Sequence, residues 1–124
     1  DLEVVNLYAD IQPGEFNSQN CVKVVMDLVG NAMYMSRAPI PVSTDGVERP
    51  TGKQLGLIAF RRDALQKFTK LEPTPLEIYE SVDMLRFLEH GIKIRMQRTA
   101  YRTHAVDIPA DIAEVERLMK SKTN

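Results

Sequence analysis

The chain has 124 residues with a formal net charge of −1, and 44% of them are hydrophobic and 27% charged. That length suits one domain with one core, and the near-neutral charge excludes a general nucleic-acid-binding protein, which carries a basic excess. No apolar run approaches the roughly 18 residues of a membrane-spanning helix, so we expect no membrane segment, and the single cysteine, Cys21, favours a reducing compartment such as the cytoplasm.

Three strands are predicted in the first third of the chain. Residues 4–11, 21–27 and 32–37 are rich in β-branched and aromatic side chains, and turn-forming residues separate them. The third strand ends at two closely spaced prolines, which do not continue a sheet. A polar loop of residues 42–54 follows, and loops of this length usually have a function.

The next segment predicts a strand followed by a helix. Residues 55–62 are almost continuously apolar, which is typical of a strand buried on both faces. Asp63 comes directly after it and reads as an N-cap, since aspartate accepts hydrogen bonds from the free N–H groups of a first helical turn. Apolar residues at helical spacing over residues 64–71 then predict a short helix.

A longer helix is predicted over residues 75–90. Thr74 precedes a proline and stands three residues before Glu77, which is the spacing of a capping box. Apolar side chains continue at helical spacing to the end of this segment. His90 and Gly91 then end the helix, a cation and a glycine at the positions where each is favoured.

The last third of the chain predicts one more strand and a closing helix. Residues 92–98 alternate between apolar and polar side chains, as in a strand with one solvent-facing side. A short apolar segment, residues 103–107, precedes a helix over residues 108–122. Four apolar residues of this helix are expected to face inward: Ile112, Val115, Leu118 and Met119. The mixture of strands and helices over residues 1–124 predicts a single α/β domain.

Asp107 ends the short apolar segment, at the kind of strand end where ligands bind in α/β sheets. Two interpretations are open. The carboxylate caps the last helix, or it is a ligand of a hard cation such as Mg²⁺, which prefers oxygen ligands. A second carboxylate or a substrate phosphate would have to share that ion. His104 has no second metal-type ligand at a metal spacing, so no zinc site is expected.

Arg37 stands between an apolar strand and the prolines, and two interpretations are open for it as well. It pairs with a carboxylate such as Glu48 and fixes the loop that follows, or its planar guanidinium holds a substrate carboxylate or phosphate through two hydrogen bonds. The chain has no glycine-rich phosphate loop, Gly-x-Ser-x-Gly motif or Cys-x-x-Cys motif. Residue chemistry alone therefore gives no complete active site.

Four segments of the chain, in order, carry a resemblance to a known family. They are "VKVVMDLVGNAMYMSRAPIP", "GKQLGLIAFRRDALQKF", "LEPTPLEIYESVDMLRFLEHGIKIR" and "AVDIPADIAEVERL", within residues 20–119. With this order and spacing the chain resembles the C-terminal half of the sugar-acid cytidylyltransferases. The likeness is greatest to the 3-deoxy-manno-octulosonate cytidylyltransferases, or CMP-Kdo synthetases, and smaller to the acylneuraminate cytidylyltransferases.

The resemblance implies an enzyme that joins CMP from CTP to the anomeric hydroxyl of a 2-keto-3-deoxy sugar acid and releases pyrophosphate. It implies Mg²⁺ as cofactor, a homodimer with residues 33–53 as dimerisation strand and loop, and the Rossmann-like mixed sheet with flanking helices of nucleotide-diphospho-sugar transferases. The resemblance assigns four residues to substrate binding: Arg37, Gln54, Glu77 and Glu80. It assigns Asp107 to metal binding, because residues 105–111 match a metal-binding run of the family.

The chain departs from the family pattern at several positions. Gln54 stands where the family usually has histidine, Ile58 where it has tyrosine, and Asp83-Met84 where it has Glu-Gln. Because of these changes, the resemblance does not determine which sugar acid is the substrate, and a nonulosonate is one alternative. The family's phosphate loop, cytosine pocket and second metal carboxylate have no counterpart in the 124 residues. Two hypotheses follow: the chain belongs to a longer cytidylyltransferase and is inactive alone, or it is a binding or oligomerisation module of the same ancestry.

Overall fold

The computed structural model describes residues 1–45, 51–101 and 103–122. Within these residues, five strands form a sheet: β1 (Val4–Asp10), β2 (Lys23–Met26), β3 (Ala32–Ser36), β4 (Gly52–Phe60) and β5 (Arg95–Arg98). Four helices accompany the sheet: α1 (Arg62–Lys70), α2 (Pro75–Glu80), α3 (Leu85–Glu89) and α4 (Pro109–Lys122). Along the chain, four strands are followed by three helices, and then by β5 and α4. The mixture of strands and helices that the α/β prediction expects is therefore present.

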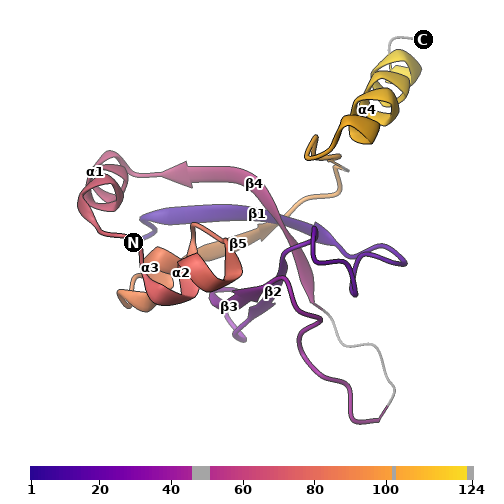
Figure 1. The fold of residues 1–124 in the computed structure, drawn as a ribbon. Coiled ribbons are helices and arrows are strands. Elements are labelled where there is room, and N and C mark those ends of the chain that lie inside the picture. Colours follow the sequence, from indigo (N-terminus) through magenta and orange to yellow (C-terminus); the bar gives the residue numbers. More distant parts are fainter. Residues whose placement is uncertain (46–50, 102, 123–124) are drawn as a thin grey trace.

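The sheet is mixed, with strand order β3-β2-β4-β1-β5 (Figure 1). β1 pairs in parallel with β5, and the other neighbours pair antiparallel. The pairing of β1 with β4 shifts register between Asn6 and Tyr8, which marks a bulge-like irregularity. The turn before β3 also reaches β5, where the backbone N–H of Met96 donates to the carbonyl of Gly30 at 2.9 Å.

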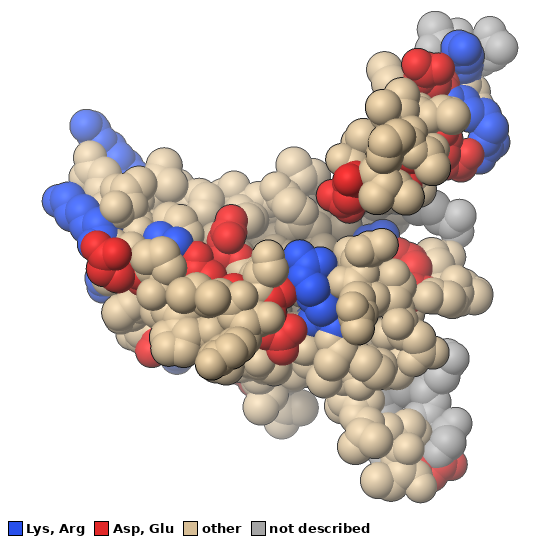
Figure 2. Space-filling view, in the orientation of Figure 1, with Lys and Arg blue, Asp and Glu red and all other residues tan. Residues whose placement is uncertain are grey.

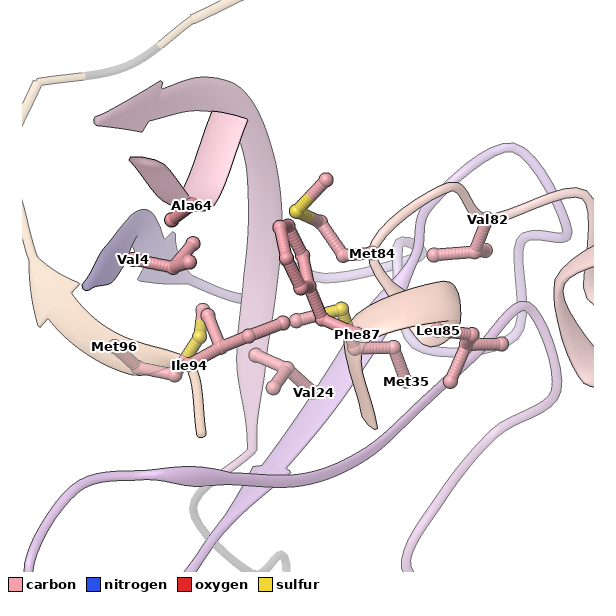
Figure 3. Packing of buried hydrophobic residues seen from close by; sticks show 10 residues of the cluster. All are labelled: Val4, Val24, Met35, Ala64, Val82, Met84, Leu85, Phe87, Ile94 and Met96. Atoms are coloured by element: carbon pink, nitrogen blue, oxygen red, sulfur yellow. The ribbon is translucent and has the colours of Figure 1, made fainter. Parts of the chain in front are cut away.

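The core lies between the sheet and helices α1 to α3 (Figure 3). Its buried members come from strands, helices and the two segments that precede α3 and β5: Val4, Val24, Met35, Ala64, Val82, Met84, Leu85, Phe87, Ile94 and Met96. The Phe87 ring packs against the rings of Phe60 and Phe68, with centroids 6.0 and 5.1 Å away. Burying one such side chain contributes about 1.5–3 kcal/mol, so Phe87 and the equally buried Leu85 anchor α3.

Both predicted helix-end signals in the middle of the chain are confirmed. The backbone N–H of Thr74 donates to Oε2 of Glu77 at 3.0 Å, as the capping-box spacing requires. His90 is the C-cap of α3, and Gly91 follows it with a φ of 72°, a left-handed conformation that glycine adopts without strain.

The prediction of one continuous helix over residues 75–90 is wrong. α2 ends at Glu80, Ser81 has a left-handed φ of 53°, and α3 begins only at Leu85. The guanidinium of Arg37 donates to the carbonyls of Glu80 and Ser81. In a continuing helix those two carbonyls would accept backbone N–H groups four residues later. A contact from a distant strand therefore takes the place of the helical hydrogen bonds.

Two details of the predicted β4–α1 segment are also wrong. β4 begins earlier, at Gly52, and it is not buried on both faces, since the Leu57 side chain is 55% exposed. Asp63 is not the N-cap of α1. The helix starts at Arg62, so Arg61 occupies the cap position and Asp63 lies in the first turn, where its charge still suits the helix dipole.

The C-terminal part differs most from the prediction. Residues 103–107 form no strand, and β5 begins three residues later than predicted. α4 stands away from the sheet and has no buried residue (Figures 1 and 2). The stripe expected to face inward is not covered: Ile112 and Met119 are 51% and 66% exposed, and Val115 and Leu118 are only half-buried. In the described part of the chain, no helix combines the length and the apolar character needed to cross a bilayer.

Candidate functional site

Glu80, the last residue of α2, holds the end of β3 through its side chain. Its carboxylate accepts hydrogen bonds from the hydroxyls of Tyr34 (3.0 Å) and Ser36 (2.7 Å) and from the backbone N–H of Arg37 (3.0 Å). Burial raises the pKa of Glu80, but these hydrogen bonds and the Arg37 charge outweigh burial and hold the pKa below its ordinary value. The carboxylate is therefore ionised at neutral pH and directed at β3.

Arg37 ties the end of β3 to two other segments. Its guanidinium donates to backbone carbonyls of Glu80 (2.8 Å), Ser81 (2.9 Å) and Gln19 (3.0 Å). Three of its five N–H groups are thus used on the protein itself. The predicted partner Glu48 lies outside the described residues. Arg37 does fix the chain around it, but through carbonyls of α2 and of the loop before β2.

Lys23, which was not a predicted site residue, completes this arrangement. Its side chain is fully buried, and Nζ donates to three backbone carbonyls, those of Ser18 (2.7 Å), Cys21 (2.6 Å) and Arg37 (2.6 Å). Burial lowers the pKa of Lys23. The available signal was a lone lysine inside the apolar run "CVKVVM". We call Lys23, Ser36, Arg37 and Glu80 the strand-end cluster.

Glu77, which is buried, and Arg86, which is half-buried, form an ion pair that joins α2 to α3. Arg86 donates from Nη2 to Oε1 of Glu77 at 2.5 Å and from Nε to Oε2 at 2.8 Å. The guanidinium also lies 4.3 Å from the centroid of the Phe68 ring and donates to the carbonyl of Leu71 at 3.1 Å. The hydrogen bonds from Arg86 lower the pKa of Glu77, against the effect of burial. Within the described residues, the Glu77 carboxylate is bonded to Arg86 and to the backbone N–H of Thr74.

Gln54 lies near the start of β4 and contacts β1. Its Nε2 donates to Oδ1 of Asn6 at 2.9 Å, and Asn6 is fully buried. The Gln54 side chain itself is only partly buried. Asn6 was not predicted as a site residue, and its signal was a lone amide within the apolar run "VVNLYA".

Asp107 lines a groove of about 940 Å³ between α4 and the ends of β1 and β5. The N-cap interpretation of Asp107 is wrong, because α4 begins at Pro109 and the Asp107 carboxylate accepts no hydrogen bond from another described residue. The carboxylate of Asp111 instead accepts the backbone N–H groups of Asp107 and Ile108, each at 3.0 Å. These two hydrogen bonds lower the pKa of Asp111. No group of three or more His, Cys, Asp or Glu side chains suited to a metal occurs among the described residues.

A family model described as "Cytidylyltransferase" matches residues 3–94. The chain belongs to the cytidylyltransferase family. Curated relatives named 3-deoxy-manno-octulosonate cytidylyltransferase match nearly all of this cytidylyltransferase chain. The relative from Oleidesulfovibrio alaskensis is 42% identical over 120 residues, covering 96% of the chain and 48% of the relative. The relative from Nitratidesulfovibrio vulgaris is 44% identical over 123 residues, covering 96% and 49%.

A solved structure gives the same result at the level of the fold. The structure of CMP:2-keto-3-deoxy-manno-octonic acid synthetase complexed with CTP has a TM-score of 0.89 and 35% identity to the cytidylyltransferase chain. The match covers 98% of this chain and 50% of that one. The predicted mixed sheet with flanking helices, of the nucleotide-diphospho-sugar-transferase type, is therefore confirmed. The chain spans about half the length of the relatives that it matches.

The predicted site residues of the cytidylyltransferase chain fall in separate places. Arg37 and Glu80 contact each other, and Glu77 lies one turn away from Glu80 on α2. Gln54 joins β4 to β1. Asp107 lines the groove, and none of the other four predicted residues does. Their roles in substrate and metal binding stay predictions.

Proposed function

We propose that the protein containing this chain transfers CMP from CTP to a 2-keto-3-deoxy sugar acid of the Kdo type and releases pyrophosphate. The observation that carries the proposal is the similarity to relatives named 3-deoxy-manno-octulosonate cytidylyltransferase, which are 42–44% identical over 96% of the chain. The solved neighbour named as the corresponding synthetase, complexed with CTP, supports it. In this reaction the anomeric hydroxyl of the sugar acid attacks the α-phosphorus of CTP, and the bond to the pyrophosphate leaving group breaks.

The four residues predicted to bind the sugar acid divide by their internal contacts. Arg37 has two N–H groups beyond the three it uses on carbonyls, and Gln54 is partly exposed. We assign these two residues to contact with the sugar acid. Glu77 and Glu80 have their carboxylates bonded to internal partners. We therefore assign them the task of holding α2, α3 and the end of β3 in place.

Asp107 is proposed as a Mg²⁺ ligand. Its side chain is exposed in the groove and forms no hydrogen bond with another residue of the described ranges, so its carboxylate oxygens are available to a hard cation. One carboxylate supplies one ligand, and the remaining ligands would be triphosphate oxygens and water. When bound, the ion would offset negative charge on the triphosphate.

A homodimer is also proposed, with residues 33–53 as the contact. β3 is an edge strand, and the side chains of Met33 and Val42 are 64% and 78% exposed. Exposed edge strands and apolar side chains favour association with another chain. Residues 46–50 of this segment lie outside the described part. We place the reaction in the cytoplasm, as the single cysteine predicts.

The deciding experiment is an assay of pyrophosphate release by the whole gene product. The assay contains CTP, Mg²⁺ and one sugar acid, either the eight-carbon Kdo or a nine-carbon nonulosonate. We expect release that requires both CTP and Kdo. Release with the nonulosonate alone would change the assigned substrate. No release with either acid would overturn the proposed activity and favour a non-catalytic module.

A further inference from the structure

Asn6 occupies the irregularity between β1 and β4, and its side chain has no freedom of orientation. Nδ2 donates to the carbonyls of Leu55 (2.7 Å), Leu57 (3.2 Å) and Leu7 (3.1 Å). Carbonyl oxygens accept hydrogen bonds and never donate them, so only the amide nitrogen suits this position. Turning the amide over would face its oxygen toward these carbonyls inside a fully buried site.

The fixed orientation of Asn6 determines that of Gln54. Because the Nδ2 of Asn6 points at β4, its Oδ1 needs a donor, and Nε2 of Gln54 supplies it at 2.9 Å. The opposite orientation of Gln54 would bring its Oε1 against the Oδ1 of Asn6, two acceptors without a proton between them. Gln54 is therefore held with its nitrogen toward β1.

The Oε1 atom of Gln54 is then the group left for a ligand. It forms no hydrogen bond with any residue of the described ranges. The other polar side-chain atoms of the pair, Nδ2 and Oδ1 of Asn6 and Nε2 of Gln54, are all hydrogen-bonded. The side chain is partly exposed, so the oxygen is within reach of solvent. An outward carbonyl oxygen accepts a hydrogen bond from a hydroxyl group and repels a carboxylate or a ring oxygen.

We propose that Asn6 is a positioning residue that presents Oε1 of Gln54 as a hydrogen-bond acceptor for a hydroxyl group of the sugar acid. This inference rests on the proposed function, in which Gln54 touches that substrate. Asn6 itself is buried and touches no ligand. The pair thereby selects for sugar acids that carry a hydroxyl at the contacted carbon.

The test is a double-mutant cycle in the whole gene product with Asn6→Ala, Gln54→Met and both changes together. Loss of a contact that binds substrate and transition state equally raises KM and leaves kcat unchanged. We expect Asn6→Ala to raise the KM for the sugar acid about tenfold, with kcat and the KM for CTP within twofold. In the Gln54→Met background, Asn6→Ala should leave the KM for the sugar acid unchanged.

Melting temperatures separate positioning from folding. Asn6→Ala removes the donor for the β4 carbonyls, so we expect it to lower the melting temperature in both the native and the Gln54→Met background. The matched control is Asn31→Ala, which removes another amide that bonds two side chains, those of Asp27 and Arg95, neither of which bonds to Asn6 or Gln54. This control should leave the KM for the sugar acid unchanged. The proposal would be overturned if Asn6→Ala raised the KM for the sugar acid equally in the native and Gln54→Met backgrounds. It would also be overturned if Asn6→Ala did not raise that KM in the native background.

A second readout does not depend on activity. In the whole protein, the side-chain amide protons of Gln54 should exchange with solvent more slowly than those of an exposed glutamine, and Asn6→Ala should abolish that protection. If the Gln54 amide protons are protected but Asn6→Ala leaves the KM for the sugar acid unchanged, the role in substrate binding is refuted. Absence of any sugar-acid-dependent turnover in the unchanged protein would instead overturn the proposed function, and this inference with it.

Discussion

Replacing Glu77 by glutamine should destabilise the protein by about 3 kcal/mol. Glu77 is 7% exposed, and its two carboxylate oxygens accept from Arg86 and from the backbone N–H of Thr74. Glutamine keeps one acceptor but places an NH₂ group against a donor and leaves the Arg86 charge uncompensated. Removing one partner of a buried pair costs about 3–5 kcal/mol. The retained acceptor puts Glu77→Gln at the lower end of that range.

Thermal unfolding measures this loss. For a chain of this size, 1 kcal/mol corresponds to about 4 °C in melting temperature, so Glu77→Gln should melt about 12 °C lower. The matched control is Glu114→Gln, which breaks a solvent-exposed pair with Arg117 of similar two-point geometry. Exposed pairs contribute little, so this control should melt like the unchanged protein. Equal melting temperatures for the two variants would refute the reasoning.

The same substitution has a defined pH dependence. The folded pKa of Glu77 lies below the ordinary value of 4.5, because the hydrogen bonds from Arg86 outweigh burial. The pair's contribution is therefore complete above about pH 4.5 and is lost as the pH falls through the folded pKa. The difference between native and Glu77→Gln proteins should be constant from pH 8 to pH 5 and narrow below pH 4.5. A difference that grows on acidification would contradict the ion pair.

Three further outcomes are expected. Asp107→Asn in the whole gene product should keep the melting temperature within a few degrees. It should reduce turnover more than about a hundredfold, because an amide lacks the charge that holds a hard cation. Near-normal turnover at saturating Mg²⁺ would show that Asp107 is not a metal ligand. The 124-residue chain alone should release no pyrophosphate from CTP with any 2-keto sugar acid, because it spans only about half of the relatives' length, and substrate-dependent release from the pure chain would disprove this. Light scattering at about 100 µM, well above an ordinary micromolar dissociation constant, should give the mass of a dimer. Met33→Lys should reduce that mass to the mass of a monomer. A monomeric mass for the native chain would count against the β3 contact.

Local signals in the sequence predicted the local structure well. The Thr74–Glu77 spacing located the start of α2, and Gly91 located the end of α3, since both signals act within one turn of backbone. The break between α2 and α3 escaped prediction because apolar spacing continues through it. At the break, the carbonyls of Glu80 and Ser81 accept hydrogen bonds from the guanidinium of Arg37, which is 43 residues away in sequence from Glu80.

The site was harder to predict than the fold, for the same reason. Asn6 and Lys23 gain their importance from carbonyls that distant segments bring to them, 49 residues away for Leu55 and 14 for Arg37. A lone polar residue in an apolar run is the only local trace of such contacts. The exposed stripe of α4 was misjudged because amphipathic spacing indicates that a helix has an apolar face but not what covers it.

The buried lysine has a practical consequence for following the protein's motions. Nζ of Lys23 is enclosed and bonded to three carbonyls, whereas Lys67 and Lys120 are exposed. An amine-directed reagent reaches Lys23 only when the loop at residues 18–21 parts from the end of β3. The labelling rate of Lys23, divided by that of an exposed lysine, therefore reports the fraction of time that this end of the sheet is open.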